Sequence, residues 1–341
     1  MTLSLMKQET RQAADVVAQM LAAERDNFAR LADHFERQRP KVVSTAARGS
    51  SDHAATFFKY LFEIMTGYPV ASIGPSVASV YETRLHLEGA VHVTVSQSGA
   101  SPDIVALQSA ARRGGAFTVA VVNVTESPLA READLVIGLH AGPERSVAAT
   151  KSCLAAAAAL AGVTAAITGD AALVNALERL PQALAAATGT PDSTLVDKIA
   201  PSHSLYITGR GTGFAVALEA ALKAKETCGL HAEAFSLAEV MHGPMRLVEA
   251  GFPILAFTQE DAASTASDEA MARLAGLGAD IMTIGHDSGG TRTIATPTTG
   301  HGLLDALPAL AAYYGLIEAV AQRRGLDPDR PRNLSKVTET I

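Results

Sequence analysis

Apolar positions along the chain repeat with two different periods. Residues 7–36 place apolar side chains at helical spacing, and beyond them short β-branched runs alternate with further helical stretches. Strands that alternate with helices predict a parallel sheet covered by helices on both faces. The runs expected to form strands are 41–47, 68–73, 90–95, 117–124 and 134–140.

A long helical stretch separates this region from a second region of the same kind. It runs from Val147 to about Ala187 and stops at Gly189-Thr190-Pro191, a combination typical of a break between elements. The next strand begins near Leu205. We therefore expect an α/β protein with a helical lead-in over 1–40, a first domain over 41–190, a second domain over 200–325 and a tail over 326–341.

The second region repeats motifs of the first at a constant interval of 162 residues. Self-similarity over so long a period indicates duplication of a whole domain rather than a solenoid. The predicted fold is therefore two tandem three-layer domains, each a mainly parallel sheet between helices. The repeated motifs are Arg48-Gly49-Ser50 with Arg210-Gly211-Thr212, Gly67 with Gly229, and Ser96-Gln97 with Thr258-Gln259.

Composition narrows the class of ligand and the compartment. An apolar content of 48% with 18% charged residues is typical of a globular protein with a real core. The formal net charge of −7 disfavours a nucleic-acid surface, so we expect a small-molecule ligand and no nucleic acid. Cys153 and Cys228 are too few for a disulfide framework, and residues 1–7 lack the apolar region of a signal peptide. A cytoplasmic location is predicted.

One uncharged stretch, Cys153–Gly169, has the length that raises the question of a membrane span. Alanine dominates it, and it falls short of the ~20 strongly apolar residues that a span requires. We therefore predict a buried helix at an interface and no membrane partner.

A turn rich in hydroxyl groups follows the strand that ends near Val95. Ser96, Gln97, Ser98 and Gly99 come first, and Ser101 is the expected N-cap of the next helix. Such a turn directs backbone N–H groups into one concavity, and the helix N-terminus adds about half a positive charge. A phosphate site is therefore predicted, the alternative being an ordinary strand-to-helix turn. The second copy has Glu260 and Asp261 there, which repel an anion, so only the first copy is expected to bind phosphate.

Ionisable residues concentrate in the second copy. Lys223 and Glu226 lie three residues apart, so they share a helix face. An ammonium beside a carboxylate keeps the carboxylate ionised, as a general base next to a carbonyl or imine requires. The alternative is a pair of surface ions that only supports the helix. The other members of the group are Glu219, Lys225, His231, Glu233, Glu239 and His242.

A metal site is a further hypothesis for part of this group. His231, Glu233 and His242 offer suitable ligand atoms, but their spacing fits no standard zinc motif. We therefore expect no metal and no organic cofactor.

Taken together and in order, the motifs resemble those of the SIS (sugar isomerase) domain family. The resemblance is strongest to the isomerase portion of glucosamine-6-phosphate synthase and to stand-alone glucosamine-6-phosphate deaminases built on that portion. It covers nearly the whole chain. The matching segments are 48–51, 96–99, 144–151, 218–226, 231–234, Glu239, 242–244 and 330–336.

The resemblance implies a role for each matching residue. Glu226 would move a proton between C1 and C2 of the sugar, with Lys223 and Glu144 around the substrate. His242 would assist ring opening and would come from the partner subunit, which implies a homodimer. Lys336, in the tail that closes the site, would engage the ketose carbonyl. The residues implied to hold the sugar phosphate are Ser50, Ser51, Ser96, Gln97, Ser98 and Ser101.

Two positions depart from the synthase pattern. Arg48 stands where the synthase has a small thiol side chain, and Ala149 stands where it has a hydroxyl group near the sugar. The chain also begins Met1-Thr2, without the glutamine-hydrolysing domain that supplies ammonia in the synthase. We therefore expect the reaction to run in the direction that releases ammonia, converting glucosamine 6-phosphate to fructose 6-phosphate and ammonia. The alternatives are another phosphosugar isomerase, a fructosamine-phosphate deglycase and a non-catalytic sugar-phosphate sensor.

Overall fold

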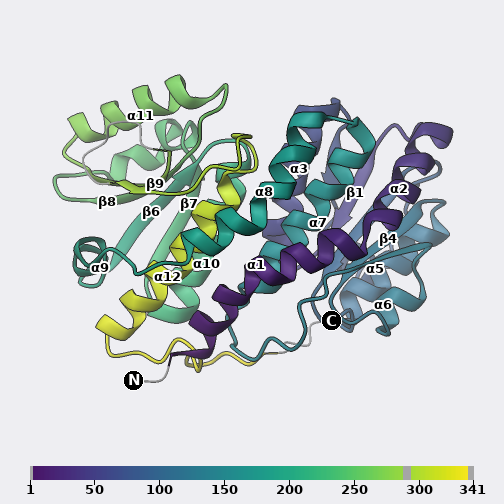
Figure 1. Ribbon diagram of the computed structural model, residues 1–341, viewed down its shortest axis with the longest axis horizontal. Coiled ribbons are helices and arrows are strands. Elements are labelled where there is room, and N and C mark those ends of the chain that lie inside the picture. The colour runs from purple at the N-terminus through teal and green to yellow at the C-terminus, as the bar shows by residue number, and fades with distance from the viewer. Residues whose placement is uncertain (1–2, 287–292, 337–341) are drawn as a thin grey trace. The chain divides into compact units, whose positions relative to one another are not determined.

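The computed structural model describes residues 3–286 and 293–336 (Figure 1). It contains two five-stranded sheets, ordered β2-β1-β3-β4-β5 and β7-β6-β8-β9-β10. All strand pairs within them are parallel. The α/β class predicted from the alternation of strands and helices is confirmed, and the two sheets have the same order of strands.

The chain forms two compact units, each built around one sheet. The first-sheet unit comprises Asp15–Glu144 and Ser152–Leu177 among the described residues. Its strands are β1 (Val43–Ala46), β2 (Val70–Ser72), β3 (Val91–Ser96), β4 (Phe117–Val122) and β5 (Leu135–Gly138). Its helices are α2 (Arg25–Gln38), α3 (Ser50–Thr66), α4 (Ser76–Ser79), α5 (Pro102–Arg113) and α6 (Pro128–Arg131).

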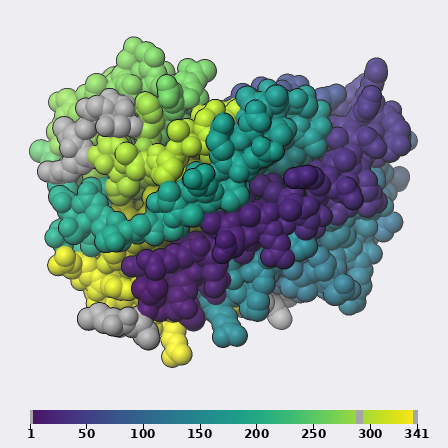
Figure 2. Space-filling view, in the orientation of Figure 1, coloured from purple at the N-terminus to yellow at the C-terminus, as the bar shows by residue number. Residues whose placement is uncertain are grey.

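The second-sheet unit comprises the described residues up to Ala14, Arg145–Lys151 and Glu178–Lys336. Its strands are β6 (Ser204–Gly209), β7 (His231–Ser236), β8 (Pro253–Thr258), β9 (Asp280–Gly285) and β10 (Thr293–Ala295). Its helical elements are α9 (Ser193–Ile199), α10 (Thr212–Cys228), η1 (Glu239–His242), η2 (Pro244–Leu247), α11 (Ser264–Gly276) and α12 (Ala306–Arg323). The remaining helices are α1 (Leu5–Ala23), α7 (Lys151–Thr168) and α8 (Ala171–Ala187), and α1 and α2 form part of the surface in Figure 2.

The duplication predicted from the repeated motifs extends to backbone angles. Helices α3 and α10 each contain 17 residues. Gly49, with φ 55° and ψ −133°, precedes α3, and Gly211, with φ 54° and ψ −127°, precedes α10. Both helices end at a left-handed glycine, Gly67 or Gly229. Glycine adopts this region without the steric cost of a Cβ atom, so the repeated glycines preserve a repeated geometry.

The two long helical stretches expected from the sequence each contain more than one helix. The lead-in breaks at Glu24, which separates α1 from α2. The stretch from Val147 breaks at Gly169, whose φ is +64°, and the Asp170 carboxylate then accepts a hydrogen bond from the amide of Leu173 at 2.7 Å. These breaks were missed because apolar periodicity continues across them, whereas a left-handed glycine followed by a capping aspartate is the local signal for a new helix.

The alanine-rich helix α7 is the described helix that is long and apolar enough to cross a membrane. Within the fold, 83% of its apolar window is buried. Small side chains permit close packing, as at Gly162, where a Cβ atom would lie 2.7 Å from the Phe28 ring. The burial predicted for this helix is confirmed, and its place at an interface stays a prediction.

A buried histidine links two strands of the first sheet. Ser44 on β1 lies opposite His92 on β3, and the Ser44 Oγ lies 2.8 Å from the His92 Nδ1. Burial lowers the pKa of His92 from 6.5 to about 4. The Nε2 atom has no hydrogen-bond partner among the described residues. The native state therefore holds this imidazole neutral at physiological pH.

We expect His92 to make the protein less stable in mild acid. The unfolded chain binds this proton near pH 6.5 and the native state only near pH 4, so stability is complete above pH 6.5 and falls as the pH drops. Between pH 7 and pH 5 this group should remove about 2 kcal/mol from the free energy of unfolding. Urea unfolding at pH 7 and at pH 5 measures this loss of stability, which should be smaller in His92→Asn than in wild type. The exposed His203→Asn variant is the control, and equal losses in wild type and His92→Asn would contradict the prediction.

Candidate active site

The serine-rich turn after β3 is held by hydrogen bonds from backbone amides to serine hydroxyl groups and to a backbone carbonyl. The Gly99 amide donates to Ser96 Oγ at 3.0 Å, and the Ala100 amide donates to Ser98 Oγ at 3.4 Å. The Gly99 carbonyl accepts from the Leu129 amide at 3.1 Å, which ties the turn to α6. The turn therefore has a defined shape at the carboxyl edge of the sheet.

Gly99 is required by this shape. Its φ is +61°, and a Cβ atom built on it would lie 2.1 Å from Ser127 Oγ and 2.6 Å from Ser127 Cβ. Ser127 is itself held, because its Oγ accepts from the Ala130 amide as the N-cap of α6. Any side chain at position 99 would displace either the turn or the start of α6.

Further residues predicted to bind phosphate surround the turn. Ser50 and Ser51 begin α3, directly after β1, and they are half-buried. Ala46 on β1 pairs with Thr94 on β3, so the carboxyl ends of these strands are neighbours. Ser101 precedes α5 as predicted, but its side chain makes no capping hydrogen bond to the helix. Two helix N-termini and several hydroxyl groups thus meet at one edge of the first sheet, a setting suited to an anion.

Glu144 lies in the same unit and is buried. Its Oε1 accepts from the Ser152 amide at 3.1 Å, and its Oε2 accepts from Ser152 Oγ at 2.6 Å. Ser152 belongs to the first turn of α7, where a carboxylate is favoured by the helix dipole. The carboxylate therefore orders the start of α7, and contact with a sugar stays a prediction.

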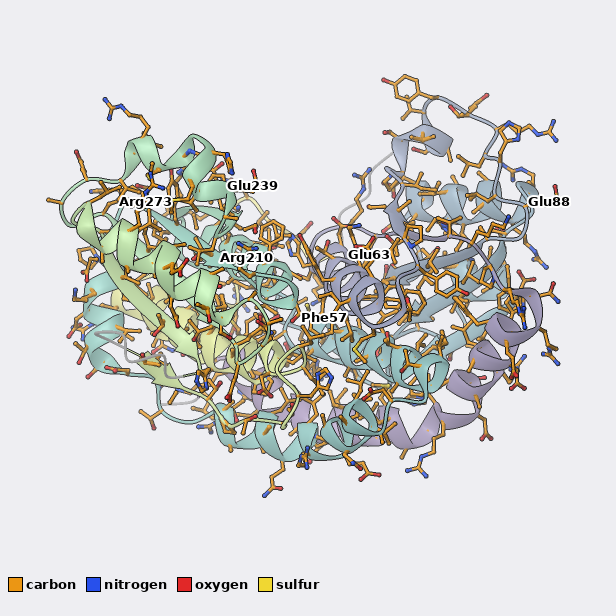
Figure 3. All side chains as sticks on the ribbon, turned by 90° about the horizontal axis from the view of Figure 1, so that it is seen from above. Phe57, Glu63, Glu88, Arg210, Glu239 and Arg273 are labelled. Carbon is orange, nitrogen blue, oxygen red and sulfur yellow. The ribbon has the colours of Figure 1, made fainter. Side chains whose placement is uncertain are left out.

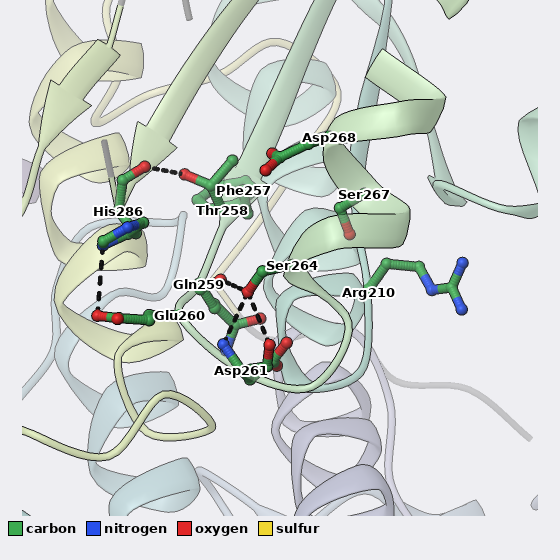
Figure 4. Close-up of a pocket in the computed structure, with 10 residues that line it drawn as sticks. All are labelled: Arg210, Phe257, Thr258, Gln259, Glu260, Asp261, Ser264, Ser267, Asp268 and His286. Carbon is green, nitrogen blue, oxygen red and sulfur yellow. Dashed lines mark hydrogen bonds and ion pairs between the residues drawn. The ribbon is translucent and has the colours of Figure 1, made fainter. Parts of the chain in front are cut away.

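The corresponding turn of the second copy borders a cavity of about 230 Å³ (Figure 4). Asp261 takes the place of Gly99, and its carboxylate accepts from the Ala263 amide at 2.8 Å. Ser264 closes the loop by donating to the Gln259 carbonyl at 2.8 Å. Three carboxylates, those of Glu260, Asp261 and Asp268, line the cavity against one guanidinium, that of Arg210, so its charge disfavours a phosphate.

The predicted acid–base pair lies on α10 of the second-sheet unit. Lys223 forms an ion pair with Glu226, and its Nζ lies 3.4 Å from Glu219 Oε1. Lys223 and Glu219 are fully buried, whereas the Glu226 side chain remains 21% exposed. The alternative of a solvated surface pair is therefore wrong. A buried ammonium between two carboxylates leaves one partner, Glu226, in reach of a ligand.

Tertiary contacts support this pair in a way that the sequence did not indicate. The Tyr314 hydroxyl on α12 donates to Glu219 Oε1 at 3.1 Å, and the Tyr313 hydroxyl donates to the Ala220 carbonyl at 2.8 Å. Burial raises the pKa of Tyr313 well above its ordinary value, so this hydroxyl remains a donor. The tyrosines were missed because they lie more than 90 residues away and resemble ordinary core positions.

His242 ends η1, in a short irregular segment between β7 and β8. Val240 beside it is buried in an apolar cluster with Tyr206, and the Tyr206 hydroxyl donates to the Pro244 carbonyl at 3.0 Å. The segment is thereby held on both sides of His242. Figure 3 labels Glu239 at the start of this segment and Arg210 between β6 and α10.

Lys336 is the last described residue, and it is half-buried in the second-sheet unit. Its contact with a carbonyl and the origin of His242 from a partner subunit stay predictions. Among residues 3–286 and 293–336, no group of three or more His, Cys, Asp or Glu side chains could hold a metal ion.

Comparison with known proteins places this architecture in a family. The SIS domain model matches residues 38–166 and 198–293, one segment for each sheet. The chain belongs to the SIS domain family. The fold is thus two tandem SIS domains, as predicted, each with a five-stranded parallel sheet.

Individual relatives agree with that assignment. The chain is 34% identical over 321 residues to a glutamine–fructose-6-phosphate aminotransferase (isomerizing) from Zymomonas mobilis, covering 89% of this chain and 52% of that enzyme. It therefore spans about half the length of this SIS relative. A crystal structure of a proposed phosphosugar isomerase from Silicibacter pomeroyi DSS-3 is 44% identical, with a TM-score of 0.90, covering 96% of this chain and 100% of that chain.

A more distant structure shows the same fold. The C-terminal domain of glucosamine-fructose-6-phosphate aminotransferase from Francisella tularensis has a TM-score of 0.85 at 23% identity. The match covers 97% of this chain and 99% of that domain. The two SIS domains described here thus share their architecture with a domain of an aminotransferase of that name.

Proposed function

We propose that this SIS protein is a phosphosugar isomerase, and more narrowly a deaminase that converts glucosamine 6-phosphate and water to fructose 6-phosphate and ammonia. The observation that carries the proposal is the buried Lys223 ammonium with Glu226 at its accessible side. The ion pair with Lys223 orients the Glu226 carboxylate, as a base that accepts a carbon-bound proton must be oriented. The similarity to enzymes that isomerise and aminate fructose 6-phosphate supports the substrate class.

The proposed reaction begins with opening of the sugar ring, assisted by His242. Glu226 then removes the proton on C2 of the amino aldehyde. The electron pair of that C–H bond forms the C1=C2 bond of an enolamine, and the C1 oxygen takes up a proton, balanced by one that the nitrogen gives up when the ketimine forms. Return of the proton to C1 yields a ketimine at C2. Addition of water to the C=N bond and departure of the nitrogen give the ketose and ammonia, so no oxidant or cofactor is consumed.

The other residues bind and orient the substrate in this proposal. The turn around Ser98 and the serines that begin α3 hold the phosphate and so anchor one end of the substrate. Glu144 contacts the sugar, and Lys336 contacts the carbonyl oxygen. A homodimer in which His242 serves the partner's site, and a cytoplasmic location, are part of the same proposal.

Product analysis tests the proposal against its alternatives. The purified protein should release ammonia and fructose 6-phosphate from glucosamine 6-phosphate in a one-to-one ratio. Formation of an isomer without ammonia would identify a pure isomerase, and release of a free amine from a fructosamine phosphate would identify a deglycase. Binding of sugar phosphates without turnover of any of them would indicate a sensor. Galactosamine 6-phosphate, tested in parallel, measures the preference for one hexosamine.

A further inference from the structure

Arg48 bridges the two turns that carry the phosphate-binding serines. It follows β1, two residues before Ser50, and its Nε and Nη2 donate to Asp103 Oδ2 at 3.0 and 2.9 Å. Asp103 is the second residue of α5, directly after the Ser96–Ser101 turn. The ion pair therefore lies between the starts of α3 and α5, at the edge where the anion is expected.

The ion pair neutralises a buried negative charge at this edge of the sheet. Asp103 is completely buried, and its Oδ1 accepts from the Ile104 amide at 2.8 Å. A carboxylate so close to the N-terminus of α5 would oppose a phosphate there if nothing neutralised it. Arg48 supplies the neutralising charge and orders its own guanidinium in doing so.

The geometry leaves Arg48 able to bind a second anion. Its side chain is 52% exposed, although one edge of the guanidinium is engaged by Asp103. A guanidinium has five N–H donors, of which this contact uses two. The planar group can therefore hold a carboxylate on one edge and present the other edge to phosphate oxygens.

The second copy provides an internal comparison. Arg210 occupies the equivalent position, before a glycine with nearly identical backbone angles. Thr265 stands where Asp103 stands in the first copy, and no ion pair of Arg210 occurs in the described part of the chain. Figure 4 shows the Arg210 side chain extended away from Asp261. An arginine clamped by a buried carboxylate is thus particular to the copy whose turn carries Ser98 and Gly99.

We propose that Arg48, oriented by Asp103, is the cationic ligand of the substrate's phosphate group and makes the site discriminate phosphorylated from unphosphorylated sugars. The inference rests on the proposed function for the identity of the substrate, but the anion it concerns can be measured without turnover. Arg48 acts on binding, not on proton transfer.

Calorimetric titration with inorganic phosphate tests the inference directly. A charge-assisted contact of this kind corresponds to a loss of about 10- to 100-fold in phosphate affinity in Arg48→Ala. Arg48→Lys keeps a positive charge beside Asp103 but lacks the planar, forked set of N–H donors of a guanidinium. Its affinity for phosphate should therefore lie between those of wild type and Arg48→Ala. Arg210→Ala is the matched control and should bind phosphate as wild type does.

Kinetics separate this role from a structural one. In Arg48→Ala, KM for the sugar phosphate should rise by the same factor as the phosphate dissociation constant, with kcat changed less than about threefold. If Arg48→Ala does not fold, the expected weakening in Arg48→Lys carries the test. Phosphate affinity within about twofold of wild type in the folded variant, or a fall in kcat alone, would overturn the inference. Arg48-dependent phosphate binding without ammonia release would instead reject only the proposed reaction.

Discussion

Replacement of Glu226 by glutamine should lower kcat for glucosamine 6-phosphate by ~10²–10⁴-fold, the usual contribution of a positioned general base. The amide has nearly the shape of the carboxylate but cannot accept a carbon-bound proton. Since we propose that other residues, around Ser98, hold the phosphate, KM should remain within about threefold of wild type. Initial rates of ammonia release over a range of substrate concentrations measure both constants.

A matched control for this variant exists on the duplicated helix. Glu63 on α3 also forms an ion pair with a lysine on its own helix, Lys59. Glu63→Gln removes the same charge from a more exposed pair, in which the Lys59 side chain is 38% exposed, and should leave kcat unchanged. Full activity of Glu226→Gln, or an equal loss in both variants, would show that Glu226 does not transfer the proton.

Replacement of Gly99 by alanine should disrupt the phosphate-binding turn. The left-handed backbone costs an alanine about 1–2 kcal/mol. The new Cβ atom would also lie 2.1 Å from Ser127 Oγ, and relief of such crowding typically costs about 1–3 kcal/mol more. We therefore expect a lower free energy of unfolding and at least a roughly tenfold weaker affinity for inorganic phosphate, measured by urea unfolding and calorimetry.

The variant Gly169→Ala separates the cost of the left-handed backbone from the cost of the contact with Ser127. Gly169 has a φ of +64°, close to the +61° of Gly99, but a Cβ atom added there would meet no described atom within 4 Å beyond its chain neighbours. This variant should lose only the backbone contribution and should bind phosphate normally. A Gly99→Ala protein with the stability and the phosphate affinity of Gly169→Ala would show that contact with Ser127 has no part in shaping the turn.

Local patterns were sufficient to predict most of the fold. Alternating apolar runs and helical stretches predicted the parallel sheets because strands and amphipathic helices each repeat their side chains with a short period. The repeated Arg-Gly motif predicted the duplication, because Gly49 and Gly211 occupy a backbone region that other residues rarely adopt. Breaks within helices, such as Gly169, were harder to predict because their signals span only a few residues.

The candidate site was predictable only in part. Lys223 and Glu226 were found from their spacing, since neighbours on one helix face are set by helix geometry alone. The burial of Lys223 distinguishes this pair from a solvated surface pair. It depends on packing against α12, whose Tyr314 hydroxyl donates to Glu219. Likewise, the ion pair that neutralises Asp103 is formed with Arg48, 55 residues away, and no local pattern indicates it.

By itself the sequence determined the class of fold, the duplication and the candidate residues for acid–base chemistry, because these follow from short-range periodicity and from side-chain type. Only the tertiary structure decided which charges are buried, which are paired and which remain accessible. The physical reason is that the energy of a charge depends on its solvent exposure and on its nearest opposite charge, and both are set by segments far apart in the chain.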